Sequence, residues 1–262
     1  MPIDLIKAHA YGNDFLFAPI DQTQPDERAG LARAMCARHA GAGGDGLVLH
    51  APTPAGSRMV LYNADGGVAE VSGNAVRCLA AVVARDRPEL DELQVETDAG
   101  PIALRKLEVN EPRWTFEAAM PPPSGLAQRT LEVAGVPVDV VELSVGNPQC
   151  IVLGGPLTEE RLHDLGAALA VHEAYPQGTN VELVEVVTPS HIRILIWERG
   201  VGPTEASGTG ACASGVAAAV FGGAARALDV ESPGGVQRVV WEDAAIRLTG
   251  WAEIVFTGRW DG

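Results

Sequence analysis

Two serine–glycine pairs are the residues of this sequence best suited to chemistry. Ser72-Gly73 and Ser207-Gly208 stand 135 residues apart, and each precedes a run of small apolar residues. Serine is a preferred helix N-cap, so one such pair alone indicates only the start of a helix. A helix N-terminus also binds carboxylates, because its N–H groups and the positive end of the helix dipole attract anions. Two copies predict two side chains on opposite faces of one substrate, where one removes a proton from a carbon and the other delivers it.

A glycine-rich string at residues 41–46, GAGGDG, matches the pattern of a dinucleotide-binding loop. That pattern binds a dinucleotide only when a strand precedes it and a helix follows. Here the sequence predicts a helix before the string and a strand over residues 47–49 after it, so we reject a dinucleotide site. We interpret the string as a turn, with Asp45 at its end placed to reach a ligand.

The charge of the chain and its few lysines exclude several functions. The 262 residues include 19 basic and 34 acidic side chains, which gives a net charge of −15. Nucleic acids and anionic membranes bind basic surfaces, so neither is expected as a partner. Only Lys7 and Lys106 are lysines, which leaves two candidates for Schiff-base chemistry.

No pattern in the sequence is typical of a secreted, membrane-spanning or metal-binding protein. The N-terminus lacks the pattern of a signal peptide, and the longest weakly apolar stretch, residues 211–225, is too short to span a bilayer. The four cysteines lie far apart without a CxxC pair, and the six histidines are scattered. We therefore expect reduced thiols, no metal site and a cytoplasmic protein.

The two serine–glycine pairs belong to a repeat that spans the chain. Further residues recur at an offset of 134 or 135: Gly12-Asn13 and Gly146-Asn147, Asp45 and Asn180, Tyr62-Asn63 and Trp197-Glu198. We interpret the repeat as a tandem duplication into two pseudo-symmetric domains. The strongest cluster of chain-breaking residues, 120–125, marks the boundary. We expect domains 1–119 and 120–249 with the active site in the cleft between them, and a return of residues 250–262 to the first domain.

Each half has the same predicted succession of elements. In the first half, strands at 4–8 and 15–19 lead to a helix near 26–39, capped at Asp26 or in the preceding turn, and then to strands at 47–51 and 58–62. A second helix follows at about 73–85, before strands at 92–97, 102–109 and 113–118. The second half has helices near 159–170 and after Gly208, and strands at 181–187 and 191–197. Helices with Ala and Val on all sides are normally buried, so we predict an α+β fold in which a curved mixed sheet wraps round a central helix, twice.

Five segments of the sequence resemble those of diaminopimelate epimerases, in the same order along the chain: YGNDF, NADGGVAEVSGNAVRC, VGNPQC, YPQGTNVELV and WERGVGPTEASGTGACAS. The resemblance implies two pseudo-symmetric domains, an enzyme that needs neither pyridoxal phosphate nor a metal, and a homodimer. It also implies the interconversion of LL- and meso-diaminopimelate, on the route to lysine and peptidoglycan. The scarcity of lysine and of metal ligands agrees with an isomerase that needs no cofactor.

The resemblance implies roles for individual positions. Ser72 and Ser207 occupy the two catalytic positions, and Arg199 matches a clamp on the distal carboxylate of the substrate, a task that suits a planar guanidinium. Gly73-Asn74 and Gly208-Thr209 match the backbone cradles of the reacting α-carboxylate. Further matches to substrate-binding positions are Asn13, Gly46, Asn63, Asn147, Asn180 and Glu198. Gln149 and Glu198 match positions that tune the catalytic pair.

Several positions of the predicted site differ from the family's pattern. Serine replaces cysteine at both catalytic positions; a thiol is roughly a few per cent ionised at neutral pH, whereas a hydroxyl needs an adjacent base. Gln149 replaces the histidine of a GNPH motif, and Gly46 stands where glutamine is frequent. Cys78 and Cys212 are expected more than a turn inside their helices, where core packing is the better interpretation. The nearby carboxylates that we consider as bases are Glu70, Glu198 and Glu205.

Three functions are compatible with this pattern. The first is a diaminopimelate epimerase-like isomerase with two acid–base positions, which turns over slowly or acts on a substrate with a more acidic proton. The second is an amino-acid-binding homologue that keeps the carboxylate cradles without the chemistry. The third is a racemase or isomerase of another amino acid. Arg199 and the four asparagines favour a dicarboxylic, diamino ligand in each case.

Overall fold

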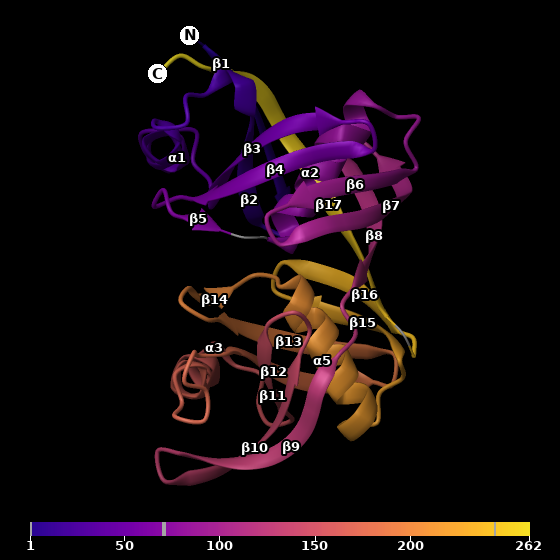
Figure 1. Cartoon of the computed structure of the whole chain (residues 1–262). Coiled ribbons are helices and arrows are strands. Elements are labelled where there is room, and N and C mark those ends of the chain that lie inside the picture. Colours follow the sequence, from indigo (N-terminus) through magenta and orange to yellow (C-terminus); the bar gives the residue numbers. More distant parts are fainter. Residues whose placement is uncertain (1, 70–71, 244) are drawn as a thin grey trace. The chain divides into compact units, whose positions relative to one another are not determined.

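The chain divides into two compact units in a computed structural model, which describes residues 2–69, 72–243 and 245–262. Unit 1 consists of Met1–Ala118 and Gly250–Gly262, and unit 2 of Ala119–Thr249. Each unit combines a strongly curved mixed sheet with one long central helix (Figure 1). The α+β class and the repeated curved sheet round a helix are therefore confirmed.

The sheet of unit 1 closes into a barrel. Its first strands are β1 (Ile3–Ala10), β2 (Asn13–Pro19), β3 (Gly46–Thr53) and β4 (Gly56–Asn63), with the short β5 (Val68–Ala69) beside β4. The barrel continues through β6 (Glu92–Thr97), β7 (Gly100–Asn110) and β8 (Arg113–Met120), and β17 (Ile246–Trp260) pairs with both β8 and β1. The pairs β2–β3 and β4–β6 are parallel, and a helix lies in the chain between the strands of each pair.

The helix α2 (Gly73–Asp86) occupies the middle of unit 1. It contacts β1, β2, β4, β6 and β7, and all residues over 74–84 are buried. A helix surrounded on all sides needs small or apolar side chains, which explains the run of Ala and Val. The two polar exceptions bond to each other, because Arg77 Nη1 donates to Asn74 Oδ1 at 3.1 Å.

Unit 2 repeats the strand order of unit 1. It contains β9 (Ser124–Val133), β10 (Val136–Ser144), β11 (Pro148–Leu153), β12 (Asn180–Thr188), β13 (His191–Glu198), β14 (Gly202–Thr204), β15 (Ala227–Ser232) and β16 (Gly235–Trp241). The parallel pairs β11–β12 and β13–β15 correspond to β2–β3 and β4–β6. Residues 246–249 of β17 pair with β16 in unit 2, and residues 253–260 of the same strand pair with β1 in unit 1.

The helix α5 (Gly208–Phe221) is the central helix of unit 2. It contacts β10, β11, β12, β13, β15 and β16, and all residues over 210–218 are buried. Two of its glycines lie where the barrel wall comes close. A Cβ at Gly215 would lie 3.2 Å from Val239 Cγ1, and a Cβ at Gly210 would overlap the carboxyl of Glu182. Small residues in α5 therefore reflect the close approach of the sheet.

Two outer helices differ from their predicted form. α1 (Arg28–Cys36) is shorter than expected, and its N-cap is Glu27, without a side-chain cap bond, instead of Asp26. The glycine-rich turn ends it early, because Gly43 N and Gly44 N donate to the carbonyls of Met35 and Cys36. The helix expected over 159–170 consists of α3 (Glu159–Arg161), a π-helical turn (Leu162–Gly166) and α4 (Ala167–Ala170).

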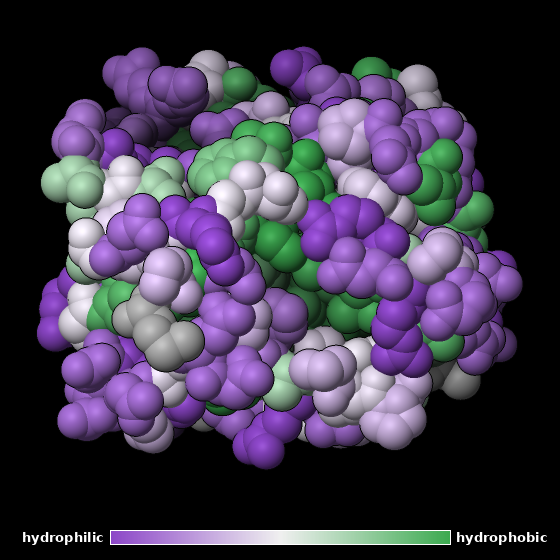
Figure 2. Space-filling view, turned by 90° about the horizontal axis from the view of Figure 1, so that it is seen from above, coloured by the Kyte–Doolittle hydropathy of each residue, from purple (hydrophilic) through white to green (hydrophobic). Residues whose placement is uncertain are grey.

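Polar residues cover most of the face drawn in Figure 2, and apolar residues show between them near its middle. Large apolar side chains that stay exposed include Val68, Val171 and Val201. Single exposed apolar residues are common on protein surfaces and carry no function by themselves. Within the described residues, no helix is long and apolar enough to cross a membrane.

Candidate active site

Ser72 and Ser207 are the N-cap residues of the two central helices, as the sequence predicts. Both have extended backbones, with φ/ψ of −133°/122° and −134°/129°. Ser72 Oγ accepts from Ala75 N at 3.3 Å, and Ser207 Oγ accepts from Gly210 N at 3.1 Å. A serine hydroxyl has one hydrogen and two lone pairs, so each serine keeps its hydrogen and one lone pair for further contacts. The N–H groups of a first helical turn have no partner within the helix and suit a carboxylate ligand.

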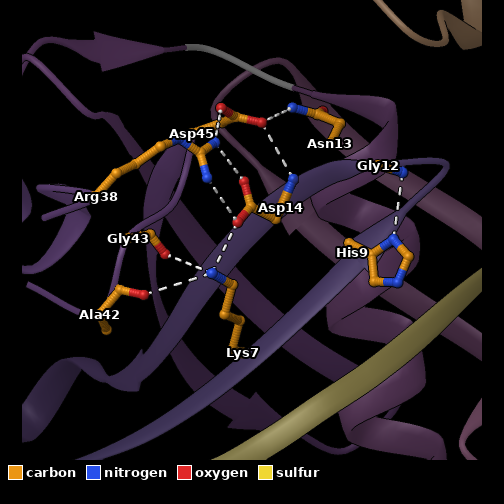
Figure 3. A network of polar contacts seen from close by, with 9 residues as sticks. All are labelled: Lys7, His9, Gly12, Asn13, Asp14, Arg38, Ala42, Gly43 and Asp45. Carbon is orange, nitrogen blue, oxygen red and sulfur yellow. Dashed lines mark hydrogen bonds and ion pairs between the residues drawn. The ribbon is translucent and has the colours of Figure 1, made fainter. Parts of the chain in front are cut away.

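In unit 1, a chain of polar contacts begins in the first turn of α2. Asn74 Nδ2 donates to Asn13 Oδ1 at 3.2 Å, and Asn13 Nδ2 donates to Asp45 Oδ2 at 2.7 Å. Both ends of the Asn13 amide are engaged, so Asp45 determines which way the amide points (Figure 3). We call Ser72, Asn13, Asp45 and Asn74 the Ser72 site. Asp45 holds Asn13 in this structure, a positioning role that the sequence did not suggest.

Two basic side chains, Arg38 and Lys7, contact the carboxylates of Asp14 and Asp45 (Figure 3). Arg38 Nη2 lies 2.8 Å from Asp14 Oδ1 and 2.8 Å from Asp45 Oδ1, and Lys7 Nζ lies 2.9 Å from Asp14 Oδ2. Burial raises the pKa of Asp14, but hydrogen bonds and charges from Arg38 and Lys7 outweigh burial and hold that pKa below its usual value. Asp45 of the Ser72 site and the adjacent Asp14 are therefore both paired with basic side chains. Lys7 is occupied here by Asp14 and by the Gly43 carbonyl, at 2.9 Å.

Gly46 and Asn63 face each other across β3 and β4. A Cβ at position 46 would lie 2.8 Å from the Tyr62 oxygen, closer than real Cβ atoms come to a backbone atom. A side chain at position 46 would therefore require this backbone to shift. Ala64 N donates to Asp45 O at 3.1 Å, so the loop after Asn63 is attached to the glycine-rich turn that carries Asp45.

In unit 2, the first turn of α5 is bonded to β11. Gln149 is 2 % exposed, and its amide lies 3.1 Å from Thr209 Oγ1 and 2.7 Å from the side chain of Asn147. Thr209 Oγ1 in turn lies 3.4 Å from Ser207 Oγ. Gln149 and Asn147 thus connect to Ser207 through Thr209, as neighbours of the predicted carboxylate cradle.

A buried carboxyl of β12, Glu182, lies next to these residues, and the sequence analysis missed it. Glu182 is fully buried, and each of its carboxyl oxygens lies 3.1 Å from the near end of the Gln149 amide. Burial, with a contribution from the charge of Glu198, raises the pKa of Glu182 well above its usual value. The signal was a single acidic residue inside the apolar run VELV. We call Ser207, Thr209, Gln149, Asn147 and Glu182 the Ser207 site.

Asn180, Glu198 and Arg199 lie beside the Ser207 site on adjacent strands. Asn180 Oδ1 accepts from Arg199 N at 2.9 Å, which fixes the backbone where β13 ends. Arg199 Nη1 donates to the Gln177 carbonyl at 3.0 Å, and its side chain is exposed. Burial raises the pKa of Glu198. The guanidinium is accessible to a ligand carboxylate, which is compatible with the predicted clamp.

The remaining candidates are two of the predicted bases and the two helix thiols. Glu205 is exposed, and Glu70 lies outside the described residues. Cys78 and Cys212 are 0 % exposed, so the prediction that they pack in the core is confirmed. Burial also raises the pKa of the Cys78 thiol. Across residues 2–69, 72–243 and 245–262, no three His, Cys, Asp or Glu side chains group as a metal site would require.

Comparisons with known proteins place these sites in a family context. The family model described as diaminopimelate epimerase matches residues 5–120 and 141–255. The diaminopimelate epimerase of Desulforudis audaxviator is 40% identical over 276 residues, covering 98% of this chain and 99% of that protein. The diaminopimelate epimerase of Pelotomaculum thermopropionicum is 36% identical, with 97% of each chain covered.

Solved structures show the same fold at much lower identity. A phenazine biosynthesis protein of the PhzF family from Bacillus anthracis has a TM-score of 0.74 at 16% identity, with 99% of each chain covered. A hydroxyproline epimerase from Agrobacterium vitis, with bound trans-4-hydroxy-L-proline, has a TM-score of 0.69 at 17% identity and covers 99% of this chain and 91% of that chain. These similarities establish the fold alone.

Proposed function

Because the chain belongs to the diaminopimelate epimerase family, we propose that it interconverts LL- and meso-diaminopimelate by proton transfer at the α-carbon. Ser72 and Ser207 are the proposed acid–base residues, one removing the α-proton and the other returning a proton to the opposite face. The product is a substrate for lysine biosynthesis.

The observation that carries this proposal is the matched N-cap geometry of the two serines. Each hydroxyl stands at the start of a buried helix, beside N–H groups that suit the reacting carboxylate. Negative charge that develops on the substrate carboxylate as the carbanion forms is stabilised by such oriented N–H groups. The same arrangement occurs once in each unit, as a two-base reaction requires.

The other candidate residues are proposed to bind the rest of the substrate. Arg199 is the proposed clamp on the distal carboxylate, and its exposed guanidinium can form two parallel hydrogen bonds with such a group. Asn13, Asn63, Asn147 and Asn180 are proposed to orient the amino groups. No cofactor is part of the proposed mechanism, in which the two hydroxyls transfer the proton and the helix N-termini bind the reacting carboxylate.

Solvent exchange at the α-carbon tests the proposal. The protein is incubated with LL-diaminopimelate in deuterated water, and loss of the α-proton is followed by NMR. We expect slow exchange with formation of the meso isomer, and loss of both in the matched variants Ser72→Ala and Ser207→Ala. A wild-type protein that binds diaminopimelate and shows no exchange above background at high concentration contradicts the epimerase.

One observation favours a second function, an amino-acid-binding protein without turnover. Both serines act as ordinary N-caps, and a hydroxyl without a strong base gives almost no alkoxide. Calorimetric titration with diaminopimelate separates the alternatives, because this function predicts binding without exchange. Proline and other amino acids in the same exchange assay test a racemase of different specificity. The homodimer that the resemblance implies and the cytoplasmic location expected from the cysteines stay predictions.

A further inference from the structure

The amide of Gln149 meets different partners in its two orientations, and with Glu182 ionised only one of them pairs donors with acceptors. With its nitrogen toward Glu182, the nitrogen lies 3.1 Å from both carboxyl oxygens, and the amide oxygen accepts from Thr209 Oγ1 at 3.1 Å and from Asn180 Nδ2 at 3.3 Å. With its oxygen toward Glu182, Gln149 Nε2 instead donates to Thr209 Oγ1 at 3.1 Å and to Asn147 Oδ1 at 2.7 Å. In this orientation Nε2 also lies 3.3 Å from Asn180 Nδ2, a second donor, and the amide oxygen faces both carboxyl oxygens of Glu182, so it requires a protonated Glu182. Nearly the same heavy-atom positions serve both orientations, provided that the Asn147 amide turns with Gln149.

The protonation state of Glu182 decides between the two orientations. An ionised carboxyl has only acceptors and needs the amide nitrogen in front of it. A protonated carboxyl has one hydrogen to donate and can face the amide oxygen. Because Glu182 is fully buried against Gln149, water cannot replace either contact, and the wrong orientation leaves buried polar atoms unpaired.

Thr209 transmits the orientation of the amide to Ser207. When the Gln149 oxygen faces Thr209, the Thr209 hydroxyl donates to it and accepts from the Ser207 hydroxyl, 3.4 Å away. When the Gln149 nitrogen faces Thr209, Thr209 accepts from it and donates to Ser207 Oγ. Gly210 N donates to Ser207 Oγ in both cases.

The consequence at Ser207 is a choice between two roles. In the first state its hydrogen points to Thr209, and a lone pair remains for the substrate. In the second state Thr209 and Gly210 fill both lone pairs, and the Ser207 hydrogen remains for the substrate. We propose that Glu182 and Gln149 form a positioning pair that sets whether Ser207 presents a lone pair or a hydrogen to the reacting carbon. No proton needs to travel along the chain, since only hydrogen-bond directions reverse.

The kinetic consequences of this inference rest on the proposed function, whereas the positioning pair itself does not. The titratable groups around Glu182 are Glu198, from β13, and Cys150, from β11. Burial raises the pKa of the Cys150 thiol to about 12, with a smaller contribution from the charge of Glu182. Glu198 disfavours a second negative charge nearby, and Cys150 stays neutral in the neutral range. Glu182 is thus the member of the Ser207 site whose charge can change.

The direct test observes the amide of Gln149 without any substrate. The side-chain ¹H–¹⁵N resonances of Gln149, assigned by their loss in Gln149→Met, are followed by NMR between about pH 4 and pH 9. We expect one titration step in the wild-type protein. The step disappears in Glu182→Gln, which preserves shape, and persists in Glu182→Asp and in the control Glu142→Gln, which removes a carboxyl bonded to Tyr175 elsewhere in unit 2.

The kinetic test compares the same variants in the exchange assay. We expect Glu182→Gln to lower kcat by about tenfold and to flatten its pH profile, with little change in KM. Glu142→Gln keeps the wild-type profile. An amide signal that stays constant with pH in the folded protein overturns the positioning pair, as does a wild-type pH profile in Glu182→Gln. If the wild-type protein shows no exchange, the proposed function fails, and the NMR titration still decides the inference.

Discussion

The Ser72 site and the Ser207 site share the backbone geometry of the serine but differ in the side chains around it. The two N-cap serines differ by 1° in φ and 7° in ψ. The strand pair Phe15–Gly46 in unit 1 corresponds to the strand pair Gln149–Asn180 in unit 2. Two residues further along the second strand of each pair stand Val48 and Glu182. Equivalent buried positions are therefore apolar, Phe15 and Val48, in unit 1, and polar, Gln149 and Glu182, in unit 2.

A third pair of equivalent positions explains how the carboxyl fits. Residue 75 of α2 is a buried Ala, whereas the corresponding residue 210 of α5 is Gly. A Cβ at Gly210 would overlap Glu182 Oε1, so the side chain of Glu182 occupies the space that the methyl group fills in unit 1. The comparison teaches that the same capped helix start forms over apolar neighbours in unit 1 and over a buried amide and carboxyl in unit 2.

The largest expected effect tests whether the serines limit turnover. The double variant Ser72→Cys, Ser207→Cys should raise α-proton exchange by about 100-fold, because a thiolate at a helix N-terminus forms far more readily than an alkoxide. Of the single variants, Ser72→Cys should gain more, since Ser207 already has polar support. NMR measures the exchange rate of each variant. Equal gains from Ser72→Cys and Ser207→Cys would show that the polar side chains around Ser207 give it no advantage.

The second prediction concerns stability at the position where the units differ. Gly210→Ala should lower the free energy of unfolding by about 2 kcal/mol, because the added methyl group overlaps the Glu182 carboxyl. Adding Glu182→Val, which copies the Val48–Ala75 pair of unit 1, should restore most of the loss. Urea unfolding of the single and double variants measures this coupling. Ala75→Gly in unit 1 is the matched control, with an expected loss of only about 0.5–1 kcal/mol.

The third prediction follows from the raised pKa of Glu182. An acid whose pKa is higher in the folded than in the unfolded protein binds more protons when folded. Stability therefore falls as pH rises from the ordinary glutamate pKa to the raised one, by about 1.4 kcal/mol per pH unit at most. Glu182→Gln should remove that loss, so its stability relative to wild type should grow with pH in urea unfolding between about pH 4.5 and 7.5. A difference that stays constant over this range contradicts a raised pKa.

The smallest expected effect lies in the Ser72 site. Asp45→Asn weakens the hold on the Asn13 amide and the contact with Arg38, and should reduce diaminopimelate affinity by about fivefold, or about 1 kcal/mol. Calorimetry measures the change. Asp243→Asn, which breaks an exposed ion pair with Arg226 in unit 2, is the control and should leave affinity unchanged. Equal affinities for both variants would show that Asp45 does not position Asn13.

Sequence patterns predicted the elements that carry the site because those signals are local. The Ser-Gly pair and the following Ala-rich run predicted that each central helix begins after Ser72 or Ser207, and the structure begins them there. The early end of α1 was not predicted, since it depends on N–H groups of the glycine-rich turn that fold back on the carbonyls of the helix. The π-helical turn at Leu162–Gly166 likewise has no clear sequence signal.

The sequence by itself determined the duplication, the capped central helices and the family of this protein, because each depends on residue types at fixed spacing along the chain. Only the tertiary structure decided that Asp45 holds Asn13, that a Cβ at position 46 would crowd the Tyr62 carbonyl, and that Glu182 lies buried against Gln149. These features depend on which strands become neighbours and in which register, and register brings together residues such as Gln149 and Glu182 that are distant along the chain. The charge of a buried carboxyl is therefore a property of its surroundings in space.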